Sequence, residues 1–174
     1  MMRSWTVAGG LILGQDGLLL VRNLRRDGSH DWSPPGGVIE AGESTVSGLT
    51  REVCEETGVE VLEWHGPVYE VVVEAPELGW QARVEAHLAR AFRGDLRVAD
   101  PDGIVVEVAW VDLLACRGRL HGCRRWVREP LEAWLDALDA LDGDGKGDGW
   151  TPRTFRYHVA GADPATAVVT PVTR

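Results

Sequence analysis

Alternation of apolar and polar residues predicts β-strands over much of the chain. Two β-prone apolar runs, 5–13 and 18–23, are separated by Gly14-Gln15-Asp16-Gly17, a sequence typical of a hairpin turn. Further short apolar or alternating runs predict strands at 59–64, 68–75, 83–92 and 105–111. Between the first pair and the rest, the segment 25–37 is rich in Gly and Pro and is predicted to be a loop.

Apolar residues at helical spacing predict two helices. The first runs over 44–57, with Ser44 as its N-cap and Gly58 as the residue that ends it. The second runs over 124–141, and Pro130 is predicted to open its main part. Its apolar stripe consists of Trp126, Leu131, Trp134, Leu135, Leu138 and Leu141. A strand-rich centre with two amphipathic helices predicts an α/β fold.

The chain divides by composition into three parts. Residues 1–141 are predicted to form one domain, residues 142–150 a flexible Gly/Asp linker, and residues 151–174 a tail. The tail could pair as a β-hairpin that edges the sheet, covers the active site or mediates a dimer. The linker superficially resembles a calcium loop, but Lys146 and Arg153 stand where acidic ligands are needed, which disfavours calcium binding.

Size and charge narrow the function. The chain has 174 residues, 44% of them hydrophobic, which is enough for one domain with a sizeable core. Its net charge of -9 disfavours a partner with a phosphate backbone, so no nucleic-acid partner is expected. A basic cluster of Arg124, Arg125 and Arg128 either holds a small anionic ligand or is a solvated helix end, which is the commoner case.

The expected setting is the cytoplasm. No apolar run reaches the ~18 residues of a membrane span, and the first residues do not have the pattern of a signal peptide, so no membrane partner is expected. The cysteines, Cys54, Cys116 and Cys123, are odd in number and form no C-x-x-C pair, which favours neither a disulfide scaffold nor a zinc site. A monomer or a homodimer is compatible with these features.

Three glutamates in the first predicted helix indicate a metal site. Glu52, Glu55 and Glu56 stand at i, i+3 and i+4, so a helix places all three carboxylates on one face. Like charges at this spacing repel each other by a few tenths of a kcal/mol per pair. A divalent cation bound through oxygen atoms would compensate for that repulsion.

The surrounding residues resemble a known family. The pattern G-x5-E-x7-R-E-U-x-E-E-x-G-U, where U is bulky and apolar, is filled at every fixed position: Gly37, Glu43, Arg51, Glu52, Val53, Glu55, Glu56, Gly58 and Val59. It resembles the Nudix box of the Nudix hydrolases, which cleave a nucleoside diphosphate linked to another moiety. The looser resemblance covers about residues 5–141 and implies an α/β/α sandwich with a mixed sheet, to which the tail adds a β-hairpin appendage.

The resemblance implies roles for these residues. It makes Glu52, Glu55 and Glu56 ligands of Mg2+ or Mn2+, with a backbone carbonyl from the Gly36-Gly37 turn as a further ligand. It makes Arg51 the residue that orients the carboxylates through salt bridges. For Glu43 two roles stay open: a salt bridge or outer metal shell, and favourable placement near the positive end of the helix dipole.

The residue that activates water is open between several carboxylates. Glu52 and Glu55 are candidates as catalytic residues, and Glu107 resembles the downstream glutamate that serves as base or extra metal ligand in some relatives. Glu107 is equally well explained as the exposed position of an alternating strand. Weaker candidates are Asp100, Asp102 and Glu74.

The substrate is expected to be a small nucleotide. Trp32 and Trp80 are candidates to stack on a nucleobase, with Arg22 as a further substrate-binding residue, although most of the eight tryptophans must be core. A nucleoside triphosphate cleaved in the manner of MutT is the expected substrate. The alternatives are ADP-ribose or a nucleotide sugar, for which Pro76 is a weak marker, and a nucleotide sensor of the same fold that does not hydrolyse its ligand.

Overall fold

The computed structural model describes residues 2–140 and 150–173. Its strands are β1 (Arg3–Leu11), β2 (Leu13–Gly14), β3 (Gly17–Leu24), β4 (His30–Ser33), β5 (Gly36–Val38), β6 (Glu60–Ala75), β7 (Trp80–Arg93), β8 (Val105–Val111), β9 (Arg153–Ala160) and β10 (Val168–Pro171). Its helices are α1 (Thr45–Thr57), α2 (Leu113–Leu120) and α3 (Arg125–Ala140), with a 3-10 turn η1 (Pro76–Leu78) between β6 and β7. No helix in these described ranges is long and apolar enough to cross a membrane.

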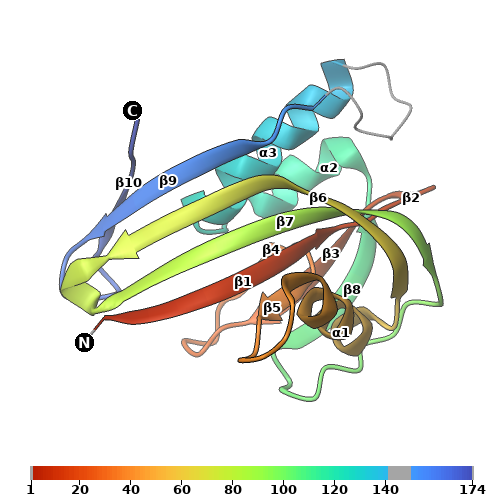
Figure 1. Ribbon diagram of the computed structural model, residues 1–174, viewed down its shortest axis with the longest axis horizontal. Coiled ribbons are helices and arrows are strands. Elements are labelled where there is room, and N and C mark those ends of the chain that lie inside the picture. Colours follow the sequence, from red (N-terminus) through yellow and green to blue (C-terminus); the bar gives the residue numbers. More distant parts are fainter. Residues whose placement is uncertain (1, 141–149, 174) are drawn as a thin grey trace.

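The strands form two sheets (Figure 1). The larger has six strands in the order β10-β9-β6-β7-β1-β5, and it is mixed because β1 runs parallel to β7 and β9 parallel to β6. In the smaller sheet, β3 pairs antiparallel with β2, β4 and β8.

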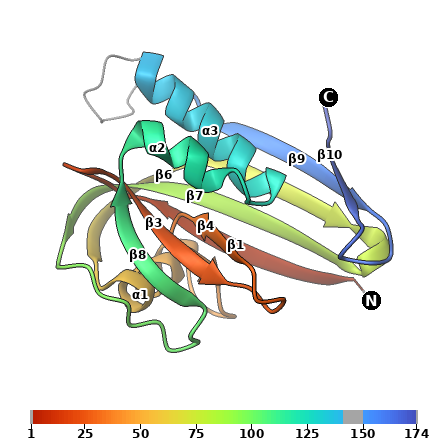
Figure 2. The ribbon, with the colours of Figure 1, turned by 180° about the vertical axis from the view of Figure 1, so that it is seen from behind.

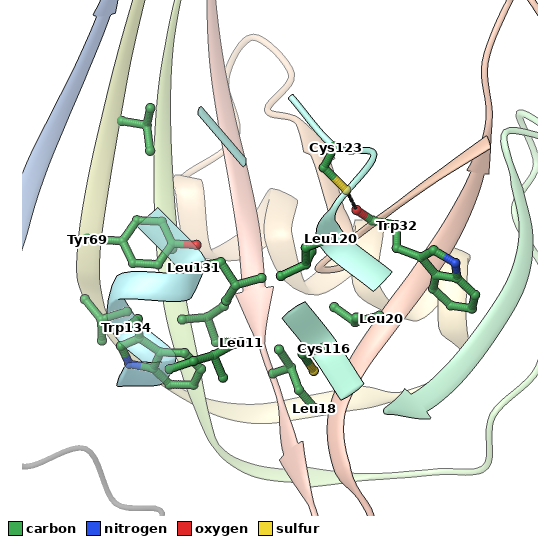
Figure 3. Close-up of a cluster of buried hydrophobic side chains, with 14 of the residues drawn as sticks. Leu11, Leu18, Leu20, Trp32, Tyr69, Cys116, Leu120, Cys123, Leu131 and Trp134 are labelled. Atoms are coloured by element: carbon green, nitrogen blue, oxygen red, sulfur yellow. Dashed lines mark hydrogen bonds between the residues drawn. The ribbon is translucent and has the colours of Figure 1, made fainter. Parts of the chain in front are cut away.

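Helices cover the sheets on two sides, with α1 on one side and α2 and α3 on the other (Figures 1 and 2). The alternation of β3 shows the layering: Leu18 and Leu20 pack in the core that contains α2 and α3, while Leu19 packs in the core that contains α1. Figure 3 shows the first of these cores, where Leu131 and Trp134 of α3 meet Leu11 of β1. The predicted α/β/α sandwich is therefore confirmed.

The predicted hairpin of 5–13 with 18–23 is confirmed only next to its turn. Leu13 and Gly14 pair with Leu18 and Gly17, and the Leu19 amide donates to the Ile12 carbonyl, whereas β1 pairs along its whole length with β7, from Arg3 opposite Trp80 to Leu11 opposite Leu88. The turn residues specify the local reversal, but the nine-residue parallel register with β7 decides where β1 lies. Segments 59–64 and 68–75 also form one strand, β6, with irregular pairing between His65 and Tyr69.

The predicted loop 25–37 contains two short strands. In β4, Trp32 lies opposite Arg22 of β3, and β5 pairs with β1 so that Gly36 lies opposite Gly9. Helix α2 was not predicted; its N-cap Asp112 accepts hydrogen bonds from the amides of the first turn.

Pro130 does not open the last helix. Helix α3 already begins at Arg125, and Pro130 lies inside it. A proline there removes a backbone donor from the helix, yet the stripe that includes Leu131, Trp134 and Leu135 is buried, and this packing holds the segment helical.

The tail forms the predicted hairpin and extends the larger sheet. β10 pairs antiparallel with β9, and β9 pairs parallel with β6. Tyr157 and Val159 of β9 are buried in the core shared with α3, and the Trp150 indole donates a 2.6 Å hydrogen bond to the Val68 carbonyl. Of the roles considered for the tail, the structure shows the one at the sheet edge. Residues 142–149 of the predicted linker, with its calcium-like pattern, lie outside the described residues.

Candidate active site

Helix α1 presents its three carboxylates next to a buried apolar stripe. Ser44 caps its start, where the Ser44 side chain accepts a hydrogen bond from the Ser47 amide, and Gly58 ends it at φ 77°. Leu49 and Val53 are buried against the sheet. Glu56 stands three residues after Val53 and seven after Leu49, so it borders this stripe, and the packing of the stripe fixes the direction of the glutamates.

Arg51 holds three carboxylates at once. Its Nε and Nη2 atoms each donate a 3.0 Å hydrogen bond to Glu43, and its Nη1 donates to Glu52 at 2.9 Å and to Glu55 at 3.1 Å. The hydrogen bonds from Arg51 lower the pKa of Glu43. The geometry thus favours the salt-bridge role for Glu43, since two parallel bonds fix both the arginine and the loop.

Glu56 lies deeper than the other two helix glutamates. The Gly36 amide donates a 2.8 Å hydrogen bond to its Oε2 atom. Burial raises the pKa of Glu56 to about 8, against the effect of this hydrogen bond, and the neighbouring Glu52, Asp100 and Glu55 add to the rise. Burial also raises the pKa of Glu52, which Arg51 opposes. The region therefore concentrates negative charge that a bound cation would relieve.

Two glycines allow the β5 backbone to approach these carboxylates. Gly36 has φ 143°, a conformation that favours glycine, and a side chain there would collide with the Ala8 carbonyl. At Gly37 a Cβ atom would stand 2.6 Å from Oε2 of Glu52. A side chain at Gly36 is thus excluded by the backbone of β1, and a side chain at Gly37 would displace the Glu52 carboxylate.

A cavity of about 680 Å³ begins at these carboxylates. This volume is within the range of roughly 300–1,000 Å³ for small-molecule sites. Its apolar lining comes from the larger sheet and from α3: Val7, Tyr69, Val71, Val73, Trp80, Ala82, Val84, Ala86, Trp126 and Val127. Its polar lining comes from α1 and the surrounding loops and strand ends: Asn23, Arg25, Ser33, Glu40, Glu52, Glu56, Asp100 and Asp102. One cavity therefore joins carboxylates to aromatic rings.

The structure brings some of the predicted site residues together in this cavity. Glu52, Glu56, Gly36, Gly37 and Trp80 all line it. Of the weaker base candidates, Asp100 and Asp102 line it as well, and Asp100 also accepts hydrogen bonds from the Ile104 and Val105 amides.

Other predicted residues lie elsewhere. Glu55 is turned toward Arg51, and Glu107 forms a 3.3 Å ion pair with Arg22; none of these four lines the cavity. Trp32 is only 7% exposed and belongs to the core (Figure 3), where its carbonyl accepts a hydrogen bond from Cys123. The Arg119 guanidinium lies over one face of its ring, 4.7 Å from the ring centre. Glu74 and Pro76, on β6 and η1, are not among the lining residues.

The sequence reasoning missed several lining residues. Trp126 was assigned to the apolar stripe of a helix, and Val127, Asn23 and Ser33 had no assigned role. The Asn23 amide donates to Ser33 at 2.9 Å and to Asp31 at 3.2 Å, which fixes its orientation at the cavity wall. A polar Asn23 after four buried apolar residues of β3 was the available signal.

The donor set fits a hard divalent cation. Glu52 and Glu56 supply carboxylate oxygens, the ligand type that Mg2+ and Mn2+ prefer, and Mg2+ retains several waters in its shell. In the part of the chain that the structure describes, no three His, Cys, Asp or Glu side chains already stand as a metal cluster. The Glu52 carboxylate accepts a hydrogen bond from Arg51, and the Glu56 carboxylate accepts one from the Gly36 amide. A bound cation would take over part of the charge compensation that these donors provide.

Comparison with known proteins gives the class. The NUDIX domain model matches residues 3–135, which is most of the chain. The chain therefore belongs to the Nudix hydrolase family. Proteins of this family act on small nucleotide substrates and generally use divalent metal ions.

Several individual relatives carry MutT in their names. The chain is 34% identical over 151 residues to "Putative mutator protein MutT4" of Mycobacterium tuberculosis (strain CDC 1551 / Oshkosh), covering 80% of this chain and 58% of that protein. It is 26% identical to "Putative 8-oxo-dGTP diphosphatase 2" of the same strain, covering 66% and 90%. The chain thus spans little more than half of the first relative. The fold matches a MutT NUDIX hydrolase from Burkholderia pseudomallei with a TM-score of 0.62, at 24% identity over 75% of this chain and 97% of that one.

Proposed function

We propose that this protein hydrolyses a nucleoside triphosphate to the nucleoside monophosphate and pyrophosphate in the presence of Mg2+ or Mn2+. The observation that carries the proposal is the cavity itself, since Glu52 and Glu56 line it together with Trp80. Carboxylates suit a metal-bound phosphate chain, and an aromatic ring suits a nucleobase. The names of the MutT-like relatives support a triphosphate substrate.

The bound cation would neutralise phosphate oxygens, lower the pKa of water and stabilise the leaving pyrophosphate. Glu52 and Glu56 would hold it together with a carbonyl of the Gly36-Gly37 turn, and Glu55, which pairs with Arg51 outside the lining, would turn toward the cation to complete the set. Arg51 would keep Glu52 and Glu55 in position, because a single guanidinium bonds both carboxylates and is itself fixed by Glu43.

Glu52 is also our choice for the residue that accepts a proton from the attacking water. It lines the cavity, and its carboxylate lies against the Gly37 backbone at the edge of β5. Asp102 lines the same wall and is the second choice. Glu107 is a less suitable base, because it pairs with Arg22 away from the lining.

At the far end of the cavity, Trp80 and Trp126 would contact the base. Their ring centres are 6.2 Å apart and the ring planes make an angle of 70°, so they present an edge-to-face corner. Asn23 and Ser33 would give the base hydrogen-bonding partners. We expect the protein to act in the cytoplasm on free nucleotides, as a monomer or a homodimer and without a nucleic-acid partner.

Incubation with Mg2+ and a nucleotide panel, followed by mass spectrometry of the products, tests the proposal. The panel would contain dGTP, its 8-oxo form, the other triphosphates, ADP-ribose and nucleotide sugars. The expected products are a monophosphate and pyrophosphate. Cleavage of ADP-ribose without turnover of any triphosphate would show that the substrate is ADP-ribose and not a triphosphate. Nucleotide binding without any product would favour a nucleotide sensor that does not hydrolyse its ligand.

A further inference from the structure

A small hollow of about 130 Å³ adjoins the far end of the main cavity. Trp80 and Trp126 line both spaces, so the two rings mark the boundary between them. The rest of its apolar wall is supplied mainly by the C-terminal hairpin and η1, through Val159, Ala167, Val169 and Leu78. The hairpin thus contributes to a binding space that continues the candidate active site.

The strand register gives the approximate separation between the hollow and the carboxylates. Gly37, which touches Glu52, lies opposite Ala8 of β1, and Ala8 lies opposite Glu85 of β7. Trp80 is five residues away along β7, which corresponds to about 16 Å at the rise of a β-strand. A nucleotide with its reactive phosphate at the carboxylates extends over most of this distance. The hollow therefore begins near the outer edge of the nucleobase.

The lining selects for an apolar occupant. Most of the residues around the hollow are aliphatic or aromatic. Of the basic residues nearby, Arg125 pairs with Glu129 at 2.7 Å and donates to the Val169 carbonyl. Arg124 lines the hollow, and its guanidinium carbon lies 5.7 Å from the centre of the Trp126 ring, which restrains that ring at the boundary.

We propose that this hollow is a second binding subsite, which takes an apolar or aromatic ring attached to the outer edge of the nucleobase. The substrate class would then be nucleotides with an enlarged, ring-bearing base. This inference rests on the proposed function for the orientation of the nucleotide. It gives the hairpin of β9 and β10 a role in substrate binding.

Steady-state kinetics with ATP and N6-benzyl-ATP test the inference, because the second nucleotide carries one extra apolar ring at the edge of the adenine. The KM for N6-benzyl-ATP should be lower than that for ATP by about tenfold or more. Val169→Trp fills the hollow and should bring the ratio of the two KM values close to one. Val168→Trp is the matched control: Val168 is the preceding residue of β10, is 60% exposed and does not line the hollow, so the ratio should stay as in the wild type.

A second pair of variants covers the case in which Val169→Trp does not fold. Pro164 lines the hollow from an exposed turn, and its neighbour Ala165 does not line it. Pro164→Trp should lower the preference and Ala165→Trp should not. Equal KM values for the two nucleotides, or a preference that survives in both filling variants, would overturn the inference.

Binding without turnover separates this inference from the proposed function. Calorimetric titration of the wild type with AMP and with N6-benzyl-AMP measures the preference whether or not any nucleotide is cleaved. Tighter binding of the benzyl form by about tenfold, lost in Pro164→Trp, would support the subsite even if no hydrolysis occurred. Equal binding together with efficient ATP hydrolysis would reject the subsite and leave the proposed function standing.

Discussion

The two ends of the cavity are built in different ways. The acidic end comes mainly from one continuous stretch, residues 36–58, in which a turn, a loop and helix α1 supply Glu52, Glu56, the arginine and the glycines; Asp100 and Asp102 join it from the segment before β8. The aromatic end comes from Trp80 on β7, Trp126 on α3 and the hairpin of β9 and β10. The residues at the acidic end are thus brought together mainly by local sequence, whereas those at the aromatic end are brought together by long-range packing.

The two ends also differ in the forces that stabilise them. At the acidic end, mutually repelling carboxylates are held by Arg51 and the Gly36 amide, and their full compensation needs a cation. At the aromatic end, apolar side chains pack against one another and have no such requirement. We therefore expect changes at the acidic end to lower kcat and changes at the aromatic end to raise KM.

The largest effect is expected for Glu56→Gln. This change keeps the size of the side chain but removes a metal-binding charge, so kcat should fall on the order of 10³-fold, and calorimetry should show weaker Mn2+ binding. Glu60→Gln is the control, because Glu60 follows the helix and forms an exposed pair with Arg93. A wild-type kcat in Glu56→Gln would show that Glu56 is not a ligand of the catalytic metal ion.

Gly37→Ala should lower kcat by about 100-fold, because the new methyl group would stand 2.6 Å from Oε2 of Glu52 and displace that carboxylate. The fold should persist, as judged by circular dichroism. Gly36→Ala should instead destabilise the fold, since it combines φ 143° with a collision at the Ala8 carbonyl. Gly118→Ala on α2 has no atom within 4 Å of the added group and should leave kcat unchanged.

Arg51→Lys should lower both kcat and Mn2+ affinity by about tenfold, because lysine keeps the charge but loses the two parallel bonds to Glu43. The metal titration distinguishes a positioning role from a purely structural one. Arg83→Lys, which alters an exposed pair with Glu70, should affect neither quantity. Loss of stability with unchanged metal affinity would contradict the positioning role.

Trp126→Leu should raise the KM for a nucleoside triphosphate about tenfold with little change in kcat, since stacking on a base contributes roughly 1–3 kcal/mol. Trp110→Leu serves as the control. Trp110 packs against Phe92 in the core next to α1, so its loss should lower the melting temperature without raising KM. Equal KM changes in both variants would mean that the tryptophans act only through stability.

The smallest effect is expected for Glu107→Gln. Glu107 pairs with Arg22 at 3.3 Å, both side chains are well exposed, and neither lines the cavity. The change should alter kcat by less than about twofold. A 100-fold loss of kcat would instead indicate that Glu107 is the base. It would also mean that its carboxylate moves into the cavity when the substrate binds.

The arrangement of α1 at the acidic end follows from the sequence because its contacts are local. The spacing of Glu52, Glu55 and Glu56 places them on one helix face whatever the rest of the fold does, and Ser44 and Gly58 mark the ends of that helix. The family resemblance associated Gly36 and Gly37 with the carboxylates, and their close approach to Ala8 and Glu52 is visible only in the structure.

The aromatic end could not be derived in the same way. Trp32 and Trp80 are equally suited to stacking by residue type, yet Trp32 is covered by Arg119 and buried, whereas Trp80 lines the cavity. Trp126 occupies an apolar position of α3 and differs from Trp134 only in lying at the first turn, at the edge of the core. Which tryptophan meets the cavity depends on the pairing of β1 with β7 and of β6 with β9, and no local pattern determines these pairings.

The central claim is that the carboxylates at one end of the cavity act in the reaction, while the aromatic rings at the other end bind the nucleobase. Paired kinetics test this claim most directly. We would measure kcat and KM of Glu52→Gln and Trp80→Leu with the best triphosphate substrate of the wild type. The account predicts a kcat lowered by at least about 100-fold with a nearly unchanged KM for Glu52→Gln, and a KM raised about tenfold with a nearly unchanged kcat for Trp80→Leu. A kcat loss confined to Trp80→Leu, or a wild-type kcat in Glu52→Gln, would contradict it.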